Sequence, residues 1–400
     1  MTLDYTSCGE WLTGAGPDSD VVVSSRVRLA RNLAGYNFVN RSDRDERQQI
    51  VDMVHRHRDT ICDEPSRLSI INLHETDSAE RSLLVERHLI SKQLAKGRQP
   101  RAVVVLPDES MAIMVNEEDH FRMQVIRSGF QLRRAYSQVN ELDDRLERRM
   151  QFAFDTRFGY LTACPTNAGT GIRISVMLHL PGLALMSSDI ERVRRAARDM
   201  HLALRGFYGE GSDALGDFFQ LSNQTTFGKT EAELLDEFEE RIVPQVVSYE
   251  RHAREELAER QSMLLDDVCH RALGILQNAR LIKIDEAMRL LSHLRLGVET
   301  GRITSVSRET INQLTLLVHS AHLQKIVGRP LQQADRSKVR AELIRAHLRG
   351  ERFPPNVPPS DAATPPGYQA PPPRNSNTKG SSPTDGPNSS PNGGGSPESN

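Results

Sequence analysis

The chain has 400 residues, of which 38% are apolar and 26% charged, and its formal net charge is −2. This length suffices for two or three domains with a sizeable hydrophobic core. The nearly neutral charge argues against a general binder of nucleic acids or membrane surfaces, because both partners attract an excess of positive charge.

The first 240 residues mix strand patterns with helix patterns. Residues 24–32, which read SSRVRLARN, predict an extended segment. Residues 101–107 and 111–116 predict a β-hairpin around a polar turn, and residues 171–181 and 218–227 predict further strands. Because hairpins and separated helices alternate here, we expect an α+β fold with a largely antiparallel sheet.

Two capping boxes predict helix starts in the same region. A Ser or Thr followed three residues later by Glu occurs at Ser188–Glu191 and at Thr230–Glu233, each time before helical periodicity. Neither a GxxxxGK[ST] loop nor a GxGxxG loop is present, so the sequence lacks both nucleotide fingerprints of the doubly wound folds.

The sequence predicts an all-α region after the mixed part. Residues 284–297 and 308–323 each have the apolar spacing of an amphipathic helix, and we expect about four helices in all. The predicted organisation is an N-terminal segment, a catalytic domain, a helical module and a tail, at residues 1–20, 21–242, 243–353 and 354–400. The tail is rich in Pro, Gly, Ser and Asn, so we expect it to be disordered, with a docking arm as the alternative.

The compartment is predicted from what is absent. No run of 18 apolar residues occurs, and the N-terminus has neither the basic nor the apolar region of a secretory signal. The four cysteines are scattered without a CxxC pair, which argues against disulfides and against a cysteine zinc site. We therefore expect a cytoplasmic protein without a membrane partner or a direct nucleic-acid partner.

The extended segment carries a pair of cations. Arg26 and Arg28 are two residues apart, so in a strand both side chains point to one face. Two guanidinium groups without a neighbouring acid favour a phosphate as partner. The alternative is a solvated basic strand at the edge of a sheet.

A second motif, NEEDHFRMQ, concentrates charge at residues 116–124. Glu117, Glu118, Asp119, His120 and Arg122 fall within one turn after a predicted strand. Such a cluster could bind Mg²⁺, form a salt-bridged loop or simply face water.

Two further motifs contain glycines that let a backbone approach a ligand. CPTNAGTGIR, at residues 164–173, begins with Cys164 and ends with Arg173. Neighbouring cations could ionise this thiol, although a small buried hydrophobic cysteine is the alternative. RGFYGEGS, at residues 205–212, sets Arg205 and Glu210 around two glycines. Five arginines and two carboxylates together predict a phosphate cage made of side chains.

These motifs resemble those of the phosphagen (guanidino) kinase family, and more closely its bacterial protein-arginine kinase branch, the McsB proteins. The matching segments are SSRVR, VERHLIS, NEEDHFR, CPTNAGTGIRISVM, RGFYGEGS and SNQTTFGKT, in the family's order. The resemblance implies transfer of the γ-phosphoryl group of ATP, with Mg²⁺, to a guanidinium nitrogen. It assigns no metal ligand to the protein.

The resemblance also implies roles for individual residues. Because a protonated arginine is a poor nucleophile, a base must accept a proton from it. Glu118 takes this role, Glu210 is its partner, and Cys164 as a thiolate places the reacting nitrogen. The residues implied to bind ATP are Ser24, Ser25, Arg26, Val27, Arg28, His88, Arg122, Arg173, Ile174, Ser175, Val176, Met177, Arg205, Gly206, Phe207, Tyr208, Gly209 and Glu210.

The acceptor is expected to be an arginine side chain of a protein. Kinases of free guanidines carry a helical domain of about a hundred residues before the SxRVR motif, whereas only 23 residues precede Ser24 here. Together with the helical module, this difference favours a protein acceptor. A small-molecule guanidino kinase and a non-catalytic adaptor that binds phosphoarginine are the alternatives.

The resemblance implies a regulatory site and partners as well. The helical module of the family carries an RDxxRA motif that binds phosphoarginine as an allosteric signal. Here the corresponding residues are Arg336, Ser337, Arg340 and Ala341, and Ser337 replaces the acidic residue, so we expect a weakened pocket. The implied partners are an activator (McsA), a Clp ATPase that degrades marked proteins or regulates stress responses, and a second copy in a homodimer.

Overall fold

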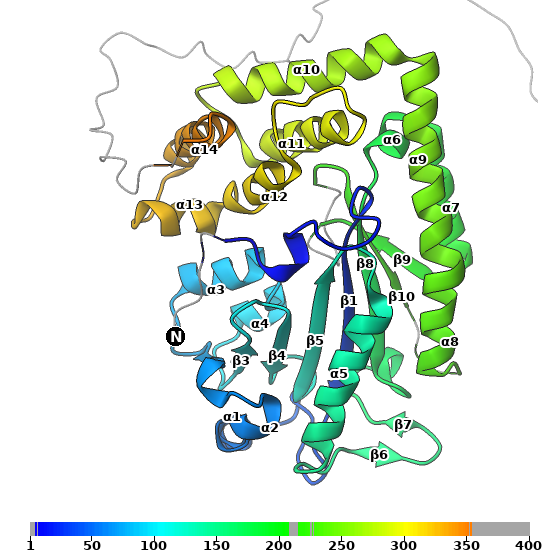
Figure 1. Ribbon diagram of the computed structural model, residues 1–400. Coiled ribbons are helices and arrows are strands. Elements are labelled where there is room, and N and C mark those ends of the chain that lie inside the picture. The colour runs from blue at the N-terminus through cyan, green and yellow to red at the C-terminus, as the bar shows by residue number, and fades with distance from the viewer. Residues whose placement is uncertain are drawn as a thin grey trace, which may run out of the picture. The chain divides into compact units, whose positions relative to one another are not determined.

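An eight-stranded antiparallel sheet lies at the centre of the structure (Figure 1). The computed structural model describes residues 5, 7–207, 215–224, 226, 228–351 and 353. The strand order is β2-β3-β4-β5-β1-β8-β10-β9, and β6 and β7 form a separate hairpin. The strands are β1 (Val22–Arg31), β2 (Ser69–Asn72), β3 (Ala102–Val105), β4 (Met111–Val115), β5 (Phe121–Ser128), β6 (Phe154–Asp155), β7 (Gly159–Tyr160), β8 (Ile172–His179), β9 (Leu202–Arg205) and β10 (Phe218–Asn223).

The predicted strands are confirmed, with one shortened. The hairpin is β3 and β4, and the segment with the paired arginines is β1. Since β1 is hydrogen-bonded to β5 on one side and to β8 on the other, the alternative of an exposed edge strand is wrong. The strand predicted over 218–227 ends at Asn223.

The helices that accompany the sheet start where local chemistry and tertiary packing allow. Thr230 accepts from the backbone N–H of Glu233 and completes the predicted capping box. The start predicted at Ser188 is wrong, because α6 runs almost directly into α7 and only Met186 remains as N-cap. These helices are α1 (Arg44–Arg56), α2 (Arg58–Ile61), α3 (Ser78–Glu86), α4 (Lys92–Lys96), α5 (Leu132–Glu147), α6 (Pro181–Leu185), α7 (Ser187–Asp199) and α8 (Glu231–Asp236).

Six helices, instead of the expected four or so, follow from residue 243 within the described residues. The helix predicted over 308–323 is broken at His319, whose backbone is extended, because the next helix begins against a carboxylate from α3. The six are α9 (Val243–Arg260), α10 (Ser262–Asn278), α11 (Ile284–Glu299), α12 (Arg308–Leu317), α13 (Ser320–Val327) and α14 (Gln333–Leu348).

The helical region and the sheet share hydrophobic contacts. A π-helical turn (Glu237–Ile242) joins α8 to α9 without a break, so helical backbone crosses the predicted boundary at residue 243. One buried cluster contains Trp11 and Leu12 of a 3₁₀ turn (Glu10–Leu12), Phe207 just after β9, Phe218 of β10, and most apolar side chains of α10 to α14. The predicted tail lies outside the described residues.

The two faces of the sheet differ in character. On one face, α5 packs on β1 and β5, and side chains such as Val27, Val125 and Ile174 form a continuous apolar core. On the other face, α3 and α4 cover only the strands near β3 and β4, with Val103 and Met114 beneath them. The central strands of this second face therefore carry polar side chains into a cavity.

Candidate active site

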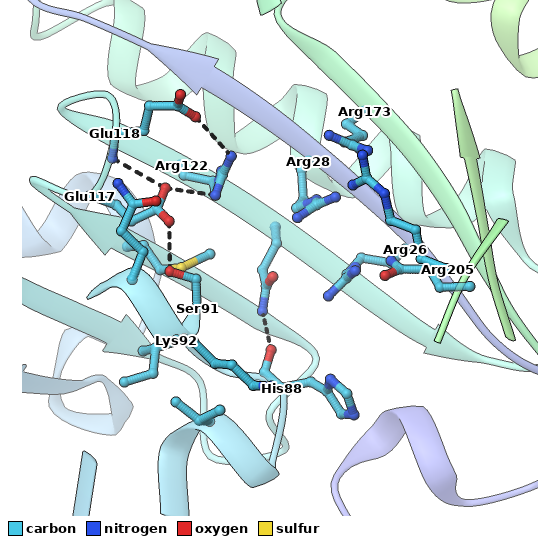
Figure 2. A pocket seen from close by; sticks show the side chains of 16 residues that line it. Arg26, Arg28, His88, Ser91, Lys92, Glu117, Glu118, Arg122, Arg173 and Arg205 are labelled. Carbon is cyan, nitrogen blue, oxygen red and sulfur yellow. Dashed lines mark hydrogen bonds and ion pairs between the residues drawn. The ribbon is translucent and has the colours of Figure 1, made fainter. Parts of the chain in front are cut away.

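The cavity of the second sheet face has a volume of about 320 Å³, within the usual range for a small-molecule site (Figure 2). Strands β1, β5, β8, β9 and β10 form its floor, and the turn between α3 and α4 forms one wall. Its lining is Arg26, Arg28, Val85, His88, Ile90, Ser91, Lys92, Gln93, Met114, Glu117, Glu118, Arg122, Gln124, Arg173, Arg205 and Gln220.

All five predicted arginines point into this one cavity (Figure 2). Strand register explains the convergence, because Arg28 pairs with Arg173 across β1 and β8, and Arg205 pairs with Gln220 across β9 and β10. Side chains alternate along each strand, so directly opposed residues share a face.

The arginines repel one another electrostatically. Burial, followed by the charges of Arg173 and Arg122, lowers the pKa of Arg26 to about 10. Burial, followed by the charges of Arg26, Arg122 and Arg173, brings the pKa of Arg28 well below its ordinary value. The Nε of Arg28 is buried and has no hydrogen-bond partner among the described residues. A polyanion in the cavity, such as a nucleoside triphosphate, would neutralise these charges and accept a hydrogen bond from the Nε of Arg28.

His88 forms the wall opposite the arginines. Its backbone has a φ of 59°, an unusual conformation for a residue other than glycine, and its carbonyl accepts from Nε2 of Gln124 at 2.9 Å. The imidazole packs edge-on against Trp11 and Phe207, at 4.8 and 5.0 Å between ring centroids. Burial, and then the charge of Arg26, lower the pKa of His88 to about 3, so the ring is neutral at physiological pH.

The two adjacent glutamates have different environments. Glu117 is buried, lies 2.6 Å from the guanidinium of Arg122, and accepts from the hydroxyl of Ser91 at 2.6 Å. Glu118 keeps a side chain that is 35% exposed, and its Oε2 lies 3.5 Å from Arg122. Glu117 therefore orients the arginine, whereas Glu118 can meet a second substrate at the mouth of the cavity.

Cys164 lies on a neighbouring loop and does not line the cavity. Its Sγ is 3.0 Å from Oγ1 of Thr166 and the residue is only partly buried, so a fully buried hydrophobic cysteine is excluded. Thr226 supports this loop by donating to the carbonyl of Ala168 at 2.6 Å.

Asp119, a member of the acidic cluster, and Asn32, to which the sequence assigned no role, connect the acidic loop with the cysteine loop. One oxygen of Asp119 accepts from Nδ2 of Asn32 and from the N–H of Ala163, both at 2.7 Å. Since Asp119 follows Glu118 and Ala163 precedes Cys164, this carboxylate fixes the two loops relative to each other. Nothing in the local sequence pattern indicates a pairing over 44 residues.

Arg31 supports the cysteine loop from the other side and was also missed. Its guanidinium is paired with Asp143 at 2.6 Å, donates to the carbonyl of Thr170 at 2.9 Å, and stacks on the ring of Tyr160 at 3.5 Å. Lys92, Gln124 and Gln220 line the cavity without having been predicted. Lys92 directly follows the VERHLIS motif, so a longer motif would have found it.

Several residues that the resemblance implies to bind ATP do not line this cavity. Ser25, Val27, Ile174 and Val176 are buried on the opposite face of β1 and β8, because strand side chains alternate. Other members surround a small cavity beside His88 or lie at the end of β9: Ser24, Ser175, Met177, Gly206 and Phe207. Tyr208, Gly209 and Glu210 lie outside the described residues.

The residues of the predicted regulatory site lie on α14. Arg340 is buried and donates to the carbonyls of Val318 at 2.7 Å and Ile282 at 2.9 Å. The Nε atoms of Arg336 and Arg329 are buried without a hydrogen-bond partner among the described residues. The hydroxyl of Ser337 donates to the carbonyl of Gln333, and Ala341 is in the core.

Comparisons with known proteins agree with this arrangement. The family described as "ATP:guanido phosphotransferase, C-terminal catalytic domain" matches residues 49–253. The family described as "Protein-arginine kinase McsB C-terminal domain" matches residues 261–360. Among solved structures, the duplicated taurocyamine kinase of Schistosoma mansoni has a TM-score of 0.54 at 24% identity over 62% of this chain and 35% of its own. Lombricine kinase has a TM-score of 0.51 at 21% identity over 62% of this chain and 70% of its own.

Curated relatives are more similar in sequence. A protein-arginine kinase of Geobacillus sp. (strain WCH70) is 42% identical over 86% of this chain and 95% of its own length. That of Symbiobacterium thermophilum is 43% identical over 84% and 96%, and that of Bacillus cereus (strain AH187) is 41% identical over 88% and 100%.

The antiparallel fold and its arginine-lined cavity define a guanidino phosphotransferase. Within that class, the chain belongs to the protein-arginine kinases. The predicted fold class, family and enzyme class are thereby confirmed. Within the described residues, no helix is long and apolar enough to cross a membrane, and no three His, Cys, Asp or Glu side chains form a metal-binding group.

Proposed function

We propose that this protein transfers the γ-phosphoryl group of ATP to arginine side chains of other proteins. The observation that carries the proposal is the convergence of five arginines on one cavity, with Glu118 partly exposed at its mouth. Such a set neutralises a triphosphate and places one carboxylate within reach of a cationic acceptor.

In the proposed reaction, a guanidinium nitrogen attacks the γ-phosphorus and a new N–P bond forms. The bond between the γ-phosphorus and the bridging oxygen breaks, and ADP leaves. Glu118 takes the proton that the guanidinium nitrogen loses. Glu210 as its partner and Cys164 as an acceptor contact belong to the same proposal.

The arginines contribute alignment and charge neutralisation. Phosphoryl transfer proceeds through a loose transition state, so the fixed positions of Arg26, Arg28, Arg122, Arg173 and Arg205 stabilise charge that spreads over the phosphate oxygens. Glu117 keeps Arg122 in place by a 2.6 Å ion pair. Because strands hold four of these side chains and a strand end holds the fifth, little reorganisation is needed.

Mg²⁺ is proposed to enter with the nucleotide. Among the described residues that line the cavity, the only carboxylates are Glu117 and Glu118, and Glu117 is paired with Arg122. Mg²⁺ keeps several waters and binds readily to phosphate oxygens, so this donor set fits a nucleotide-borne ion. When bound, the ion adds positive charge at the phosphates.

A transfer assay tests the proposal. The full chain is incubated with γ-labelled ATP, Mg²⁺ and an unfolded arginine-rich protein, and a copy with every arginine changed to lysine serves as control. We expect label only in the arginine-containing protein, and we expect acid to release it, because a phosphoramidate is acid-labile whereas phosphoserine survives. Faster labelling of free L-arginine would indicate a small-molecule kinase, and ATP-independent binding of phosphoarginine without any transfer would indicate an adaptor.

The phosphoarginine site on α14 is a second, separate proposal. It is supported by the buried Nε atoms of Arg336 and Arg329, which have no partner among the described residues. Arg340 supports backbone carbonyls, so Arg340→Ala would perturb folding as well as binding. Arg336→Ala is the cleaner variant. Calorimetric titration with free phosphoarginine should show weak binding by the wild type, tighter binding by Ser337→Asp and none by Arg336→Ala.

The proposed setting follows the family. A homodimer, the activator McsA and a Clp ATPase are the proposed partners, and degradation or stress regulation is the proposed outcome of marking a protein. Copurification with each partner, with and without ATP, tests these interactions.

A further inference from the structure

Helix α13 touches the turn that carries His88, although the two are more than 200 residues apart in the chain (Figure 1). The contact is made by Glu86, the last residue of α3. Its carboxylate accepts from the N–H of Ala321 at 2.8 Å, from the N–H of His322 at 3.0 Å, and from Nδ1 of His322 at 2.8 Å. One acidic side chain thus both caps the start of α13 and orients a histidine.

The neighbouring Arg87 completes this junction. Since Nδ1 of His322 faces Glu86 and donates, its Nε2 is left to accept from Nη1 of Arg87 at 3.3 Å. Arg87 is itself buried, is paired with Glu109 at 2.6 Å and donates to the carbonyl of Ser7 at 2.9 Å. Glu86 and Arg87 directly precede His88, so their contacts with His322 tie α13 to the backbone next to His88.

A second connection runs through aromatic rings. His319, the N-cap of α13, stacks on Phe207 with 5.8 Å between centroids and 11° between planes. Phe207 in turn packs edge-on against His88 at 5.0 Å. Phe207 thus connects the imidazole of His88 with His319 at the N-cap of α13.

The backbone at His88 does not hold this position by its own preference. A φ of 59° is uncommon for a residue with a Cβ, and such residues persist where surrounding contacts determine them. Besides the hydrogen bond from Gln124, the contacts of Glu86, Arg87 and Phe207 contribute to that determination, and all three reach α13 or its N-cap.

We propose that α13 positions His88 in the nucleotide cavity, with Glu86 and His319 as positioning residues, so that the helical region sets the affinity for ATP. This rests on the proposed function, since it takes the cavity to be the ATP site. It predicts that loosening α13 weakens ATP binding before it slows transfer at saturating ATP.

A second capping carboxylate, Glu250, provides a control that distinguishes the positioning of His88 from a general loss of stability. Glu250 caps α6 as Glu86 caps α13, since it accepts from the N–H of Gly182 at 2.9 Å and from that of Leu183 at 3.0 Å. It lies on α9 and does not line the nucleotide cavity. Glu86→Gln and Glu250→Gln therefore remove comparable capping charges at different distances from His88.

The test measures ATP binding and turnover with the full chain. We expect Glu86→Gln to raise the KM and Kd for ATP about tenfold while kcat falls less than about threefold, because a lost charged hydrogen bond acts through the position of His88. Glu250→Gln should leave the Kd for ATP within about twofold of the wild type. Equal Kd values for the wild type and Glu86→Gln, or equal losses in both variants, would overturn the positioning role.

A second pair decides the matter if Glu86→Gln does not fold. His319→Phe loses the bond of the imidazole to the backbone of Thr315 but keeps a ring on Phe207, whereas His319→Ala removes the ring. We expect ATP affinity to be retained in His319→Phe and lowered about tenfold in His319→Ala. Similar ATP affinity in both variants would refute the connection. A wild type that binds no ATP would refute the proposed function, and the positioning role with it.

Discussion

The donor side and the acceptor side of the active site are built in different ways. On the donor side, regular strands carry the arginines, and cross-strand register brings them together. On the acceptor side, Glu118 and Cys164 lie on loops, and buried polar contacts from Asp119 and Arg31 hold those loops. The difference teaches that the sheet itself places the cations for the triphosphate, whereas placement of the acceptor depends on a few side-chain bonds.

The largest expected effect is on the acceptor side, at the proposed base. Glu118→Gln keeps the shape of the side chain but cannot accept a proton, so we expect the transfer rate to fall about a hundredfold or more. Its affinity for ATP should change by less than about twofold, which equilibrium binding can check. Near-normal turnover would remove Glu118 from the base role.

The pH dependence of the free energy of unfolding tests how completely His319, which packs beside the donor side, is buried. Burial lowers the pKa of His319 to about 4, below the value near 6.5 of an unfolded chain. The unfolded state therefore binds more protons below pH 6.5, and the free energy of unfolding decreases as pH falls. We expect His319 to account for a loss of about 2 kcal/mol at pH 5.

Urea unfolding at pH 7 and pH 5 measures this loss. His319→Phe should show a smaller difference between the two pH values than the wild type. Replacement of the exposed His252 by Gln is the control and should leave the difference unchanged. An identical pH dependence in His319→Phe would mean that the imidazole titrates freely.

Arg28 offers a direct test of the donor side. Arg28→Ala removes a cation that its neighbours repel, so the ligand-free protein should be at least as stable as the wild type. We expect the Kd for ATP to rise about tenfold to a hundredfold, because a charge-assisted contact is lost. The exposed Arg133, changed to Ala, is the control for ATP affinity. Tighter or unchanged ATP binding by Arg28→Ala would contradict the phosphate cage.

Asp119 tests whether loop contacts matter on the acceptor side. Asp119→Ala removes the acceptor shared by Asn32 and Ala163, so the Cys164 loop should loosen and kcat should fall about tenfold. Asp119→Asn keeps a carbonyl oxygen and should retain most activity. ATP affinity should be unaffected in both. Equal kcat values for the two variants would show that the shared bond is not what holds the loop.

The smallest effect is expected at Cys164. Cys164→Ala should reduce kcat with a protein acceptor about threefold to tenfold, the value of one lost polar contact, and should leave ATP binding unchanged. Alkylation of the thiol should slow when nucleotide and acceptor are both bound. An unreactive thiol with full activity in the alanine variant would leave Cys164 without a role.

The sequence determined the elements and the chemistry that depend on local pattern. Alternation within SSRVR placed Arg26 and Arg28 on one face, and the Thr230–Glu233 box marked a helix start, because both effects act over a few residues. The order of the motifs identified the family and its five arginines. Their convergence on one cavity depends on the strand pairing, which sets Arg28 opposite Arg173.

Tertiary structure alone decided features that depend on partners distant in the chain. The break at His319 required the carboxylate of Glu86, 235 residues away from Ala321, and Met186 became an N-cap only because α6 ends beside it. The hydrogen bond that the N–H of Ala163 donates to Asp119 likewise joins loops that no local periodicity relates. Such contacts arise from packing of the whole chain, because a buried polar group takes whichever partner the fold brings to it.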